Sequence, residues 1–181
     1  MPGYATVTVY YQPWRVPYQS LCEELERLNR QRETAAPDPP RTVEIPVCYG
    51  GAFGPDLEAV AEAHGLSPAA VIRRHGRPLY RVYFLGFLPG FAYLGGLPAS
   101  LATPRRATPR IAVPAGSVGI AGAQTGVYPI ESPGGWQIIG QTPSCLFDPA
   151  RRPPALLRAG DRVKFTAVTA EEYGERARGS D

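Results

Sequence analysis

The sequence predicts an α+β protein in which a small α/β domain, residues 1–77, precedes a closed β domain, residues 78–181. Two observations predict this order. Apolar residues recur at helical spacing in the first part, whereas the second part consists of short apolar runs between glycines and prolines. The chain carries 20 glycines and 21 prolines among its 181 residues, which is typical of a fold with many tight turns.

The N-terminal part is predicted to contain both strands and helices. Residues 5–11 and 41–49 are rich in β-branched and aromatic side chains and predict two strands. Residues 18–28 present tyrosine and leucine at helical spacing, which predicts an amphipathic helix. Asp56 and Ser67 each precede a further helical pattern, and both residue types are favoured helix N-caps.

The second part begins with a strongly apolar strand at residues 79–85. From Gly86 to Val168, short apolar runs follow one another at close, regular spacing, as in a β-barrel or a β-sandwich. The charged tail at residues 171–181 is expected to be frayed.

Composition and spacing exclude several functional classes. A net charge of +3 without a block of basic residues does not indicate a nucleic-acid-binding protein. The three cysteines are widely spaced and the two histidines, His64 and His75, are not at metal-ligand spacing, so no metal site is expected. Residues 115–119 lack the first glycine and the following helix of a serine-hydrolase elbow. Reduced cysteines and the lack of a signal peptide predict a cytoplasmic protein.

The longest motifs lie in residues 86–149, where GFLPGFAYLGGLP is followed by IAVPAGSVGIAGAQTGVYPIESPGGWQIIGQTP and then by LFDP. IPVCYGG and FGPDLE precede them at residues 45–51 and 53–58, and LLRAGDRVKF follows at residues 156–165. Taken in this order, the motifs resemble the family of the 5-oxoprolinase B subunits, also called KipI-like or allophanate hydrolase subunit 1. The resemblance covers most of the chain.

This resemblance implies a small α/β domain followed by a cyclophilin-like β-barrel. It also implies one subunit of an ATP-dependent complex that opens the lactam of 5-oxoproline to glutamate, with ATP as the co-substrate. The expected partners are a homologous barrel protein, the C-type subunit, together with a third, A-type subunit. The isolated chain is expected to be inactive. The alternative is a regulatory binding module that inhibits a sensor histidine kinase. A carboxyl-transfer relative of urea carboxylase is a third possibility.

The sequence departs from the family pattern in two places. Members of the family carry a further strand–helix–strand unit before the segment that begins at Tyr4, and the N-terminal domain is expected to lack this unit. The WxxIG motif is commonly followed by arginine, whereas this chain has Gln141. Glutamine keeps hydrogen bonding but loses the charge-assisted bidentate contact of a guanidinium.

Three residues are candidates for the chemistry. The family places a histidine just before the strand that leads into GFLPGF, where His75 stands, and this residue is predicted to be a general acid or base. The alternative is a structural histidine at the end of a helix, stabilised by the helix dipole. Gln124, in AGAQTG, supplies an amide with little structural reason to be there, and Glu131 supplies a carboxylate that can act as a base.

Other residues are predicted to bind substrate. Arg110 lies in an extended segment, TPRRATPR, that its prolines stiffen, and it is expected to hold a carboxylate or phosphate more than Arg105 or Arg106. Two aromatic residues, Tyr128 and Trp136, form either a wall around a small planar lactam or part of the barrel core. The predicted substrate-binding residues are Gly90, Arg110, Thr125, Tyr128, Ser132, Trp136 and Gln141.

Overall fold

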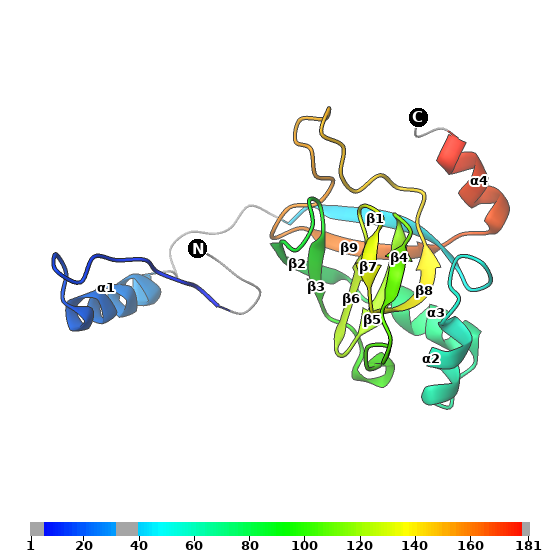
Figure 1. Ribbon diagram of the computed structural model, residues 1–181, viewed down its shortest axis with the longest axis horizontal. Coiled ribbons are helices and arrows are strands. Elements are labelled where there is room, and N and C mark those ends of the chain that lie inside the picture. Colours follow the sequence, from blue (N-terminus) through cyan, green and yellow to red (C-terminus); the bar gives the residue numbers. More distant parts are fainter. Residues whose placement is uncertain (1–5, 32–39, 179–181) are drawn as a thin grey trace. The chain divides into compact units, whose positions relative to one another are not determined.

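The computed structural model describes residues 6–31 and 40–178. The chain divides into two compact units, Met1–Pro40 and Arg41–Asp181 (Figure 1). In the first unit, the predicted helix is present as α1, Tyr18–Arg30. The predicted strand at residues 5–11 is wrong for its described part, residues 6–11, which hold a single bridge residue, Val7; Ala5 lies outside the described residues. These side chains are exposed, so alternating apolar residues alone did not produce a buried sheet face.

The second unit is built on a closed barrel with the strand order β1-β8-β5-β6-β3-β2-β9 (Figure 1). All neighbours are antiparallel except β1 and β9, which run parallel over six residue pairs and close the barrel. The barrel strands are β1 Thr42–Tyr49, β2 Tyr80–Leu85, β3 Ala92–Gly95, β5 Ser117–Ala121, β6 Gln124–Val127, β8 Gln137–Gln141 and β9 Arg162–Ala167. A separate two-stranded sheet pairs β4 Arg110–Val113 with β7 Ser132–Gly134.

The helices of this unit are short. The predicted N-cap at Ser67 is confirmed, because its side chain accepts a hydrogen bond from the backbone N–H of Ala70. The predicted frayed tail is wrong over residues 171–178, where Tyr173 packs on Phe53 with ring centroids 4.6 Å apart; residues 179–181 lie outside the described part. The helices are α2 Leu57–Ala63, α3 Pro68–Gly76, the 3-10 helix η2 Ala99–Leu101 and α4 Ala170–Arg178.

The boundary between the compact units differs from the one predicted at residue 77. The strand at residues 42–49, predicted for an N-terminal domain, is a barrel strand, because β1 lies between β8 and β9. Local periodicity shows that a segment is a strand but not which strands it pairs with. The α+β class and the closed barrel are confirmed, whereas the cyclophilin-like type of this barrel stays a prediction.

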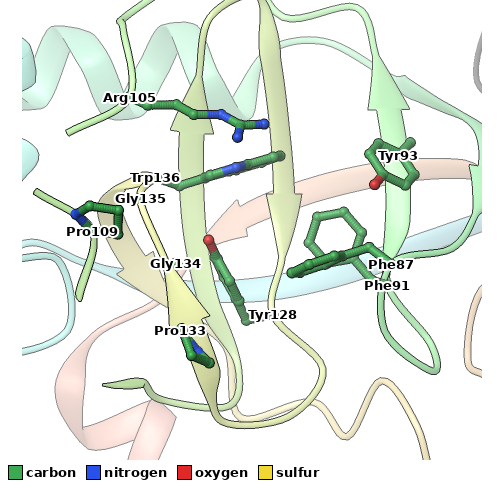
Figure 2. A pocket seen from close by; sticks show the side chains of 10 residues that line it. All are labelled: Phe87, Phe91, Tyr93, Arg105, Pro109, Tyr128, Pro133, Gly134, Gly135 and Trp136. Carbon is green, nitrogen blue, oxygen red and sulfur yellow. The ribbon is translucent and has the colours of Figure 1, made fainter. Parts of the chain in front are cut away.

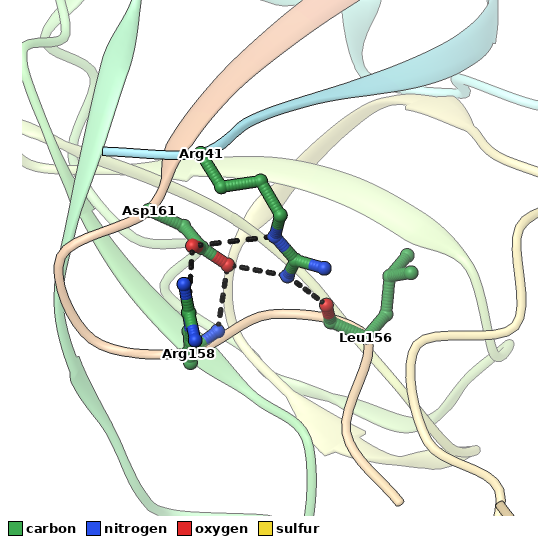
Figure 3. Close-up of polar contacts among 4 residues, drawn as sticks. All are labelled: Arg41, Leu156, Arg158 and Asp161. Atoms are coloured by element: carbon green, nitrogen blue, oxygen red, sulfur yellow. Dashed lines mark hydrogen bonds and ion pairs between the residues drawn. The ribbon is translucent and has the colours of Figure 1, made fainter. Parts of the chain in front are cut away.

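A buried carboxylate joins the two ends of the barrel unit (Figure 3). Asp161 accepts hydrogen bonds from Arg41 Nη2 at 2.6 Å and from the backbone N–H of Arg158 at 3.0 Å. Arg41 Nη2 also donates to the carbonyl of Leu156 at 2.6 Å. These contacts hold the loop before β9 against the start of β1, where the parallel pairing begins.

The barrel has two apolar clusters on opposite sides of β5. Val118 and Ile120 belong to the cluster inside the barrel, and Ala121 belongs to a second cluster that also contains Phe91 and Trp136. This split follows from the strand period of two, which directs alternate side chains to opposite faces of a sheet. The second cluster therefore lies on the outer face, where it forms the floor of the pocket described below. Among the described residues, no helix has both the length and the apolar character to span a bilayer.

Candidate functional site

A pocket of about 320 Å³ opens on the outer face of the barrel (Figure 2). Its walls come from the turn after β2, from the segment before β4, and from β7 with the two residues that follow it. Among the predicted substrate-binding residues, Tyr128 and Trp136 line it. The complete lining is Phe87, Phe91, Tyr93, Arg105, Pro109, Tyr128, Pro133, Gly134, Gly135 and Trp136.

The aromatic rings of the pocket floor pack against one another. The Phe91 ring meets the Trp136 and Tyr128 rings edge to face, with centroids 5.7 Å and 6.0 Å away. Gly126 makes this packing possible, because a Cβ there would lie 3.2 Å from both Phe91 and Trp136. The two alternatives for the predicted pair Tyr128 and Trp136 are thus both realised: their rings are buried in the second cluster, and they also form the pocket wall.

The turn after β2 contains a residue with an unusual backbone conformation. Phe87 has φ +71°, a conformation that is rare for a bulky residue, and the residue is 66% exposed and lines the pocket. Hydrogen bonds from Gly86 N to the Phe91 carbonyl and from Phe91 N to the Leu88 carbonyl hold this turn. Strain of this kind is found where a side chain must be presented at a site.

Arg105 provides the positive charge of the pocket. In the view of Figure 2 its side chain extends above the Trp136 ring, with Tyr128 on the other side of Trp136. No hydrogen bond or ion pair joins the Arg105 guanidinium to another residue in the part of the chain that the structure describes. The guanidinium is therefore free to bind an anion that enters the pocket.

Arg110, predicted to be the main anion-binding residue, has an internal partner instead. Its Nη1 and Nη2 donate to the two carboxylate oxygens of Asp56, each at 2.8 Å. Arg106 Nη1 donates to the same carboxylate at 2.9 Å, and the backbone N–H of Ile138 donates to it at 2.6 Å. Burial by itself would raise the pKa of Asp56, but the hydrogen bonds from Arg110 and Ile138 hold that pKa below its ordinary value. Arg110 is thus paired inside the protein with a carboxylate 54 residues earlier in the chain, and its role in binding an anion stays a prediction.

His75 and Thr125, both predicted for the site, lie inside the barrel and away from the pocket. Both side chains are fully buried, and His75 Nε2 lies 2.9 Å from Thr125 Oγ1. Thr125 Oγ1 donates to the Gly119 carbonyl at 2.9 Å, so it accepts the Nε2–H of His75. His75 Nδ1 then accepts the hydroxyl proton of Tyr49 at 2.8 Å. Burial lowers the pKa of His75 to about 3, so the ring is neutral and serves as a core hydrogen-bonding group.

The phenol of Tyr128 is the polar group of the pocket floor. Burial raises its pKa, while a backbone hydrogen bond with Trp136 and the charges of Arg105 and Arg110 act in the opposite direction. The hydroxyl oxygen would lie 2.3 Å from a Cβ at position 134, so only glycine fits there. A neutral phenol beside a guanidinium can donate a hydrogen bond to a bound carbonyl or carboxylate.

The remaining predicted residues do not line the pocket. Gln124 begins β6 and is partly exposed; its neighbour Thr125 points inward, so Gln124 lies on the outer face of the barrel. Glu131 is exposed just before β7 and makes no hydrogen bond or ion pair with the described residues. Ser132 is buried, and its Oγ has no hydrogen-bond partner among them. The Gln141 amide donates to the carbonyl of Ala115 at 2.7 Å.

Gly90 also has a structural role. Its φ is +79°, and a Cβ there would lie 2.7 Å from the Cβ of Phe147. The residue therefore allows the turn after β2 to pack closely against the segment at residues 146–147. Within the described residues, no group of three or more His, Cys, Asp or Glu side chains is placed to hold a metal ion.

Sequence reasoning missed Phe87, Phe91, Tyr93 and Arg105 as members of one site. The aromatic residues stand in the GFLPGFAY motif, and nothing local in this motif indicates which other segments lie beside it. The pairing of Leu94 with Thr125 supplies the missing information, because this antiparallel register sets Tyr93 opposite Gly126 on the outer face. Knowledge of that register would have placed the motif beside Trp136.

A model of the carboxyltransferase domain, subdomains C and D, matches residues 1–157. Three curated proteins, each named as the B subunit of 5-oxoprolinase, are 49–55% identical to the chain. The chain belongs to the family of the 5-oxoprolinase B subunits. The Bacillus subtilis relative is 49% identical over 96% of this chain and 76% of its own length. The Escherichia coli O157:H7 relative is 55% identical over 91% of this chain and 75% of its own.

Solved structures with closely and distantly related sequences have the same fold. A conserved uncharacterized protein from Pyrococcus horikoshii superimposes with a TM-score of 0.72 at 52% identity, over 90% of this chain and 74% of that one. The Kluyveromyces lactis urea amidolyase superimposes with a TM-score of 0.67 at 19% identity, over 94% of this chain and 12% of that one. At that identity, the second likeness shows a shared fold alone.

Proposed function

We propose that the chain is the B-type subunit of an ATP-dependent 5-oxoprolinase, and that its pocket binds 5-oxoproline. The observation that carries this proposal is the 49–55% identity to three proteins named as 5-oxoprolinase B subunits. The complex opens the lactam to glutamate with ATP as the co-substrate, and its other members are a homologous barrel protein of C type and a third subunit of A type.

The chemistry of the pocket supports this substrate. 5-Oxoproline is a small, nearly planar five-membered lactam with one carboxylate. A pocket of about 320 Å³ lies at the small end of the range for ligand sites, and its aromatic walls suit the flat ring. The free guanidinium of Arg105 provides a partner for the carboxylate, and the Tyr128 hydroxyl provides a hydrogen bond for the lactam or the carboxylate.

In this proposal the chain binds and orients the lactam rather than completing the reaction. The sequence contains no phosphate-binding loop of the Walker type, so the partners are proposed to bind ATP. Gln124 and Glu131 remain proposed catalytic groups, since both are at least partly exposed. His75 is not retained as a proposed catalytic group, because both of its ring nitrogens form hydrogen bonds inside the barrel.

The experiment is reconstitution of the complex from purified subunits. The chain alone should show no ATP hydrolysis that depends on 5-oxoproline, and addition of both the A-type and C-type subunits should restore turnover to glutamate. Turnover by the single chain would refute the need for partners. If the three proteins together remain inactive while the chain inhibits autophosphorylation of a sensor histidine kinase, the regulatory alternative replaces this proposal.

A further inference from the structure

We infer that Asp56 is a positioning residue of the pocket: its carboxylate holds Arg106 and Arg110 so that Arg105 alone faces the ligand. This inference rests on the proposed function, since it assigns Arg105 to the substrate carboxylate. It also makes a claim about the free protein, namely that Asp56 determines where the Arg105 guanidinium lies.

Asp56 accepts several hydrogen bonds at once. Its carboxylate accepts two hydrogen bonds from Arg110, one from Arg106 and one from the backbone N–H of Ile138, at 2.6–2.9 Å. The Asp56 side chain is only 6% exposed. Removing one partner of a buried charge pair strongly destabilises a protein, because the other charge stays buried without an opposite charge beside it.

Asp56 stands at the start of a helix but does not serve that helix. It is the N-cap residue of α2, but its side chain makes no capping hydrogen bond to that helix. An aspartate at this position normally accepts from the helix backbone. The carboxylate here accepts hydrogen bonds instead from two arginines that follow it by 50 and 54 residues.

The segment around Arg105 is fixed on both sides. The carbonyl of Pro104 accepts from Gln137 Nε2 at 3.0 Å, and the backbone N–H of Arg106 donates to the Gly135 carbonyl at 2.8 Å. The Arg106 and Arg110 side chains are held by Asp56. Arg105 stands between these attachments, and its own side chain is directed over the pocket (Figure 2).

These contacts have two consequences for the pocket. They fix the backbone from which Arg105 extends. Less conformational entropy is therefore lost when the Arg105 guanidinium binds a ligand. They also neutralise Arg106 and Arg110 internally, so neither competes with Arg105 for the carboxylate of the substrate. Without the Asp56 carboxylate, three arginines in six residues would share one ligand anion.

The kinetic test is a double-mutant cycle in the reconstituted complex. Asp56→Asn keeps the size of the side chain but loses the charge, and it should raise the KM for 5-oxoproline about tenfold with kcat little changed. Arg105→Ala should raise KM at least as much, and adding Asp56→Asn to it should raise KM no further. Asp148→Asn is the matched control, because that carboxylate serves a loop outside the pocket.

A second measurement needs neither ligand nor partners. The chain has two tryptophans, so in a Trp14→Phe background the fluorescence comes from Trp136. Iodide, an anionic quencher, should be drawn to Trp136 by Arg105, whereas neutral acrylamide should not. Arg105→Ala should reduce quenching by iodide, and Asp56→Asn should alter it when Arg105 is present but not when Arg105 is replaced by alanine, while acrylamide quenching stays as it was in each variant.

The outcomes separate the inference from the function on which it rests. If Asp56→Asn raises KM by the same factor with and without Arg105, or leaves iodide quenching intact, Asp56 does not act through Arg105 and the inference is refuted. If the wild-type complex does not turn over 5-oxoproline, the proposed function fails, and the iodide comparison still decides the role of Asp56. Should Asp56→Asn not fold, Arg106→Gln replaces it in both measurements, with a smaller effect in the same direction because Arg110 keeps its two bonds.

Discussion

His75 Nε2 and Thr125 Oγ1 lie 2.9 Å apart inside the barrel, where each is a hydrogen-bond partner of the other. The bond belongs to a chain that runs from the Tyr49 hydroxyl through His75 and Thr125 to the Gly119 carbonyl. This chain joins α3 to three barrel strands, β1, β5 and β6. Its polar atoms are buried and paired, which makes it a stabilising network of the core rather than part of the pocket.

The neutral state of His75 makes stability depend on pH. Burial lowers the pKa of His75 to about 3. An unfolded histidine titrates near pH 6.5, so below that pH the unfolded chain takes up a proton that the folded chain does not. Stability is thus complete above about pH 6.5 and falls as the pH is lowered, by about 2 kcal/mol between pH 7 and pH 5. Urea unfolding of the wild type and of His75→Gln measures this difference, and equal pH slopes would contradict the account.

Thr125→Val should destabilise the protein without altering the pocket. The substitution keeps the shape but leaves the Gly119 carbonyl and the His75 Nε2–H without their partner, which costs about 1–3 kcal/mol. The free energy of unfolding should fall by that amount, while the KM of the reconstituted complex for 5-oxoproline stays at the wild-type value. A raised KM for 5-oxoproline with an unchanged free energy of unfolding would instead support the original prediction that Thr125 binds the substrate.

The sequence was informative about local structure and about the family, and less so about the site. The helix that begins after Ser67 and the strand near residue 80 follow from capping and apolar pattern, and the structure confirms both. The Asp56–Arg110 pair spans 54 positions, and nothing local in either segment indicates it. Pairing across a barrel depends on register, so an arginine cannot be assigned to a ligand or to an internal carboxylate before the strands are placed.

Gly134 and Gly135 provide a matched pair of substitutions in the pocket wall. A Cβ on Gly134 would lie 2.3 Å from the Tyr128 hydroxyl oxygen, whereas a Cβ on Gly135 would meet nothing closer than 3.6 Å. Gly134→Ala should therefore displace Tyr128, at a cost of about 1–3 kcal/mol, and impair 5-oxoproline turnover. Gly135→Ala should be close to wild type in thermal unfolding and in kinetics. Equal effects of the two substitutions would show that the close contact with Tyr128 is not the reason why position 134 requires glycine.

Arg110 should act mainly through stability. Arg110→Ala removes two hydrogen bonds from a buried carboxylate and should cost about 1–3 kcal/mol, with Arg106 retaining one bond to Asp56. Arg110→Lys keeps the charge but not the planar fork, so its loss should be intermediate. Chemical denaturation measures both, with the exposed Arg74→Ala as the control. Wild-type stability of Arg110→Ala would mean that the pair with Asp56 contributes nothing.

The central claim is that Arg105 binds the carboxylate of 5-oxoproline in this pocket. The most direct test compares two ligands in the reconstituted complex with Arg105→Ala: 5-oxoproline, and 2-pyrrolidinone, which has the same lactam ring without the carboxylate. The account predicts that the KM for 5-oxoproline rises about 10- to 100-fold, the loss of one hydrogen-bonded ion contact, while inhibition by 2-pyrrolidinone is unchanged. An unchanged KM for 5-oxoproline, or equal weakening of both ligands, would contradict it.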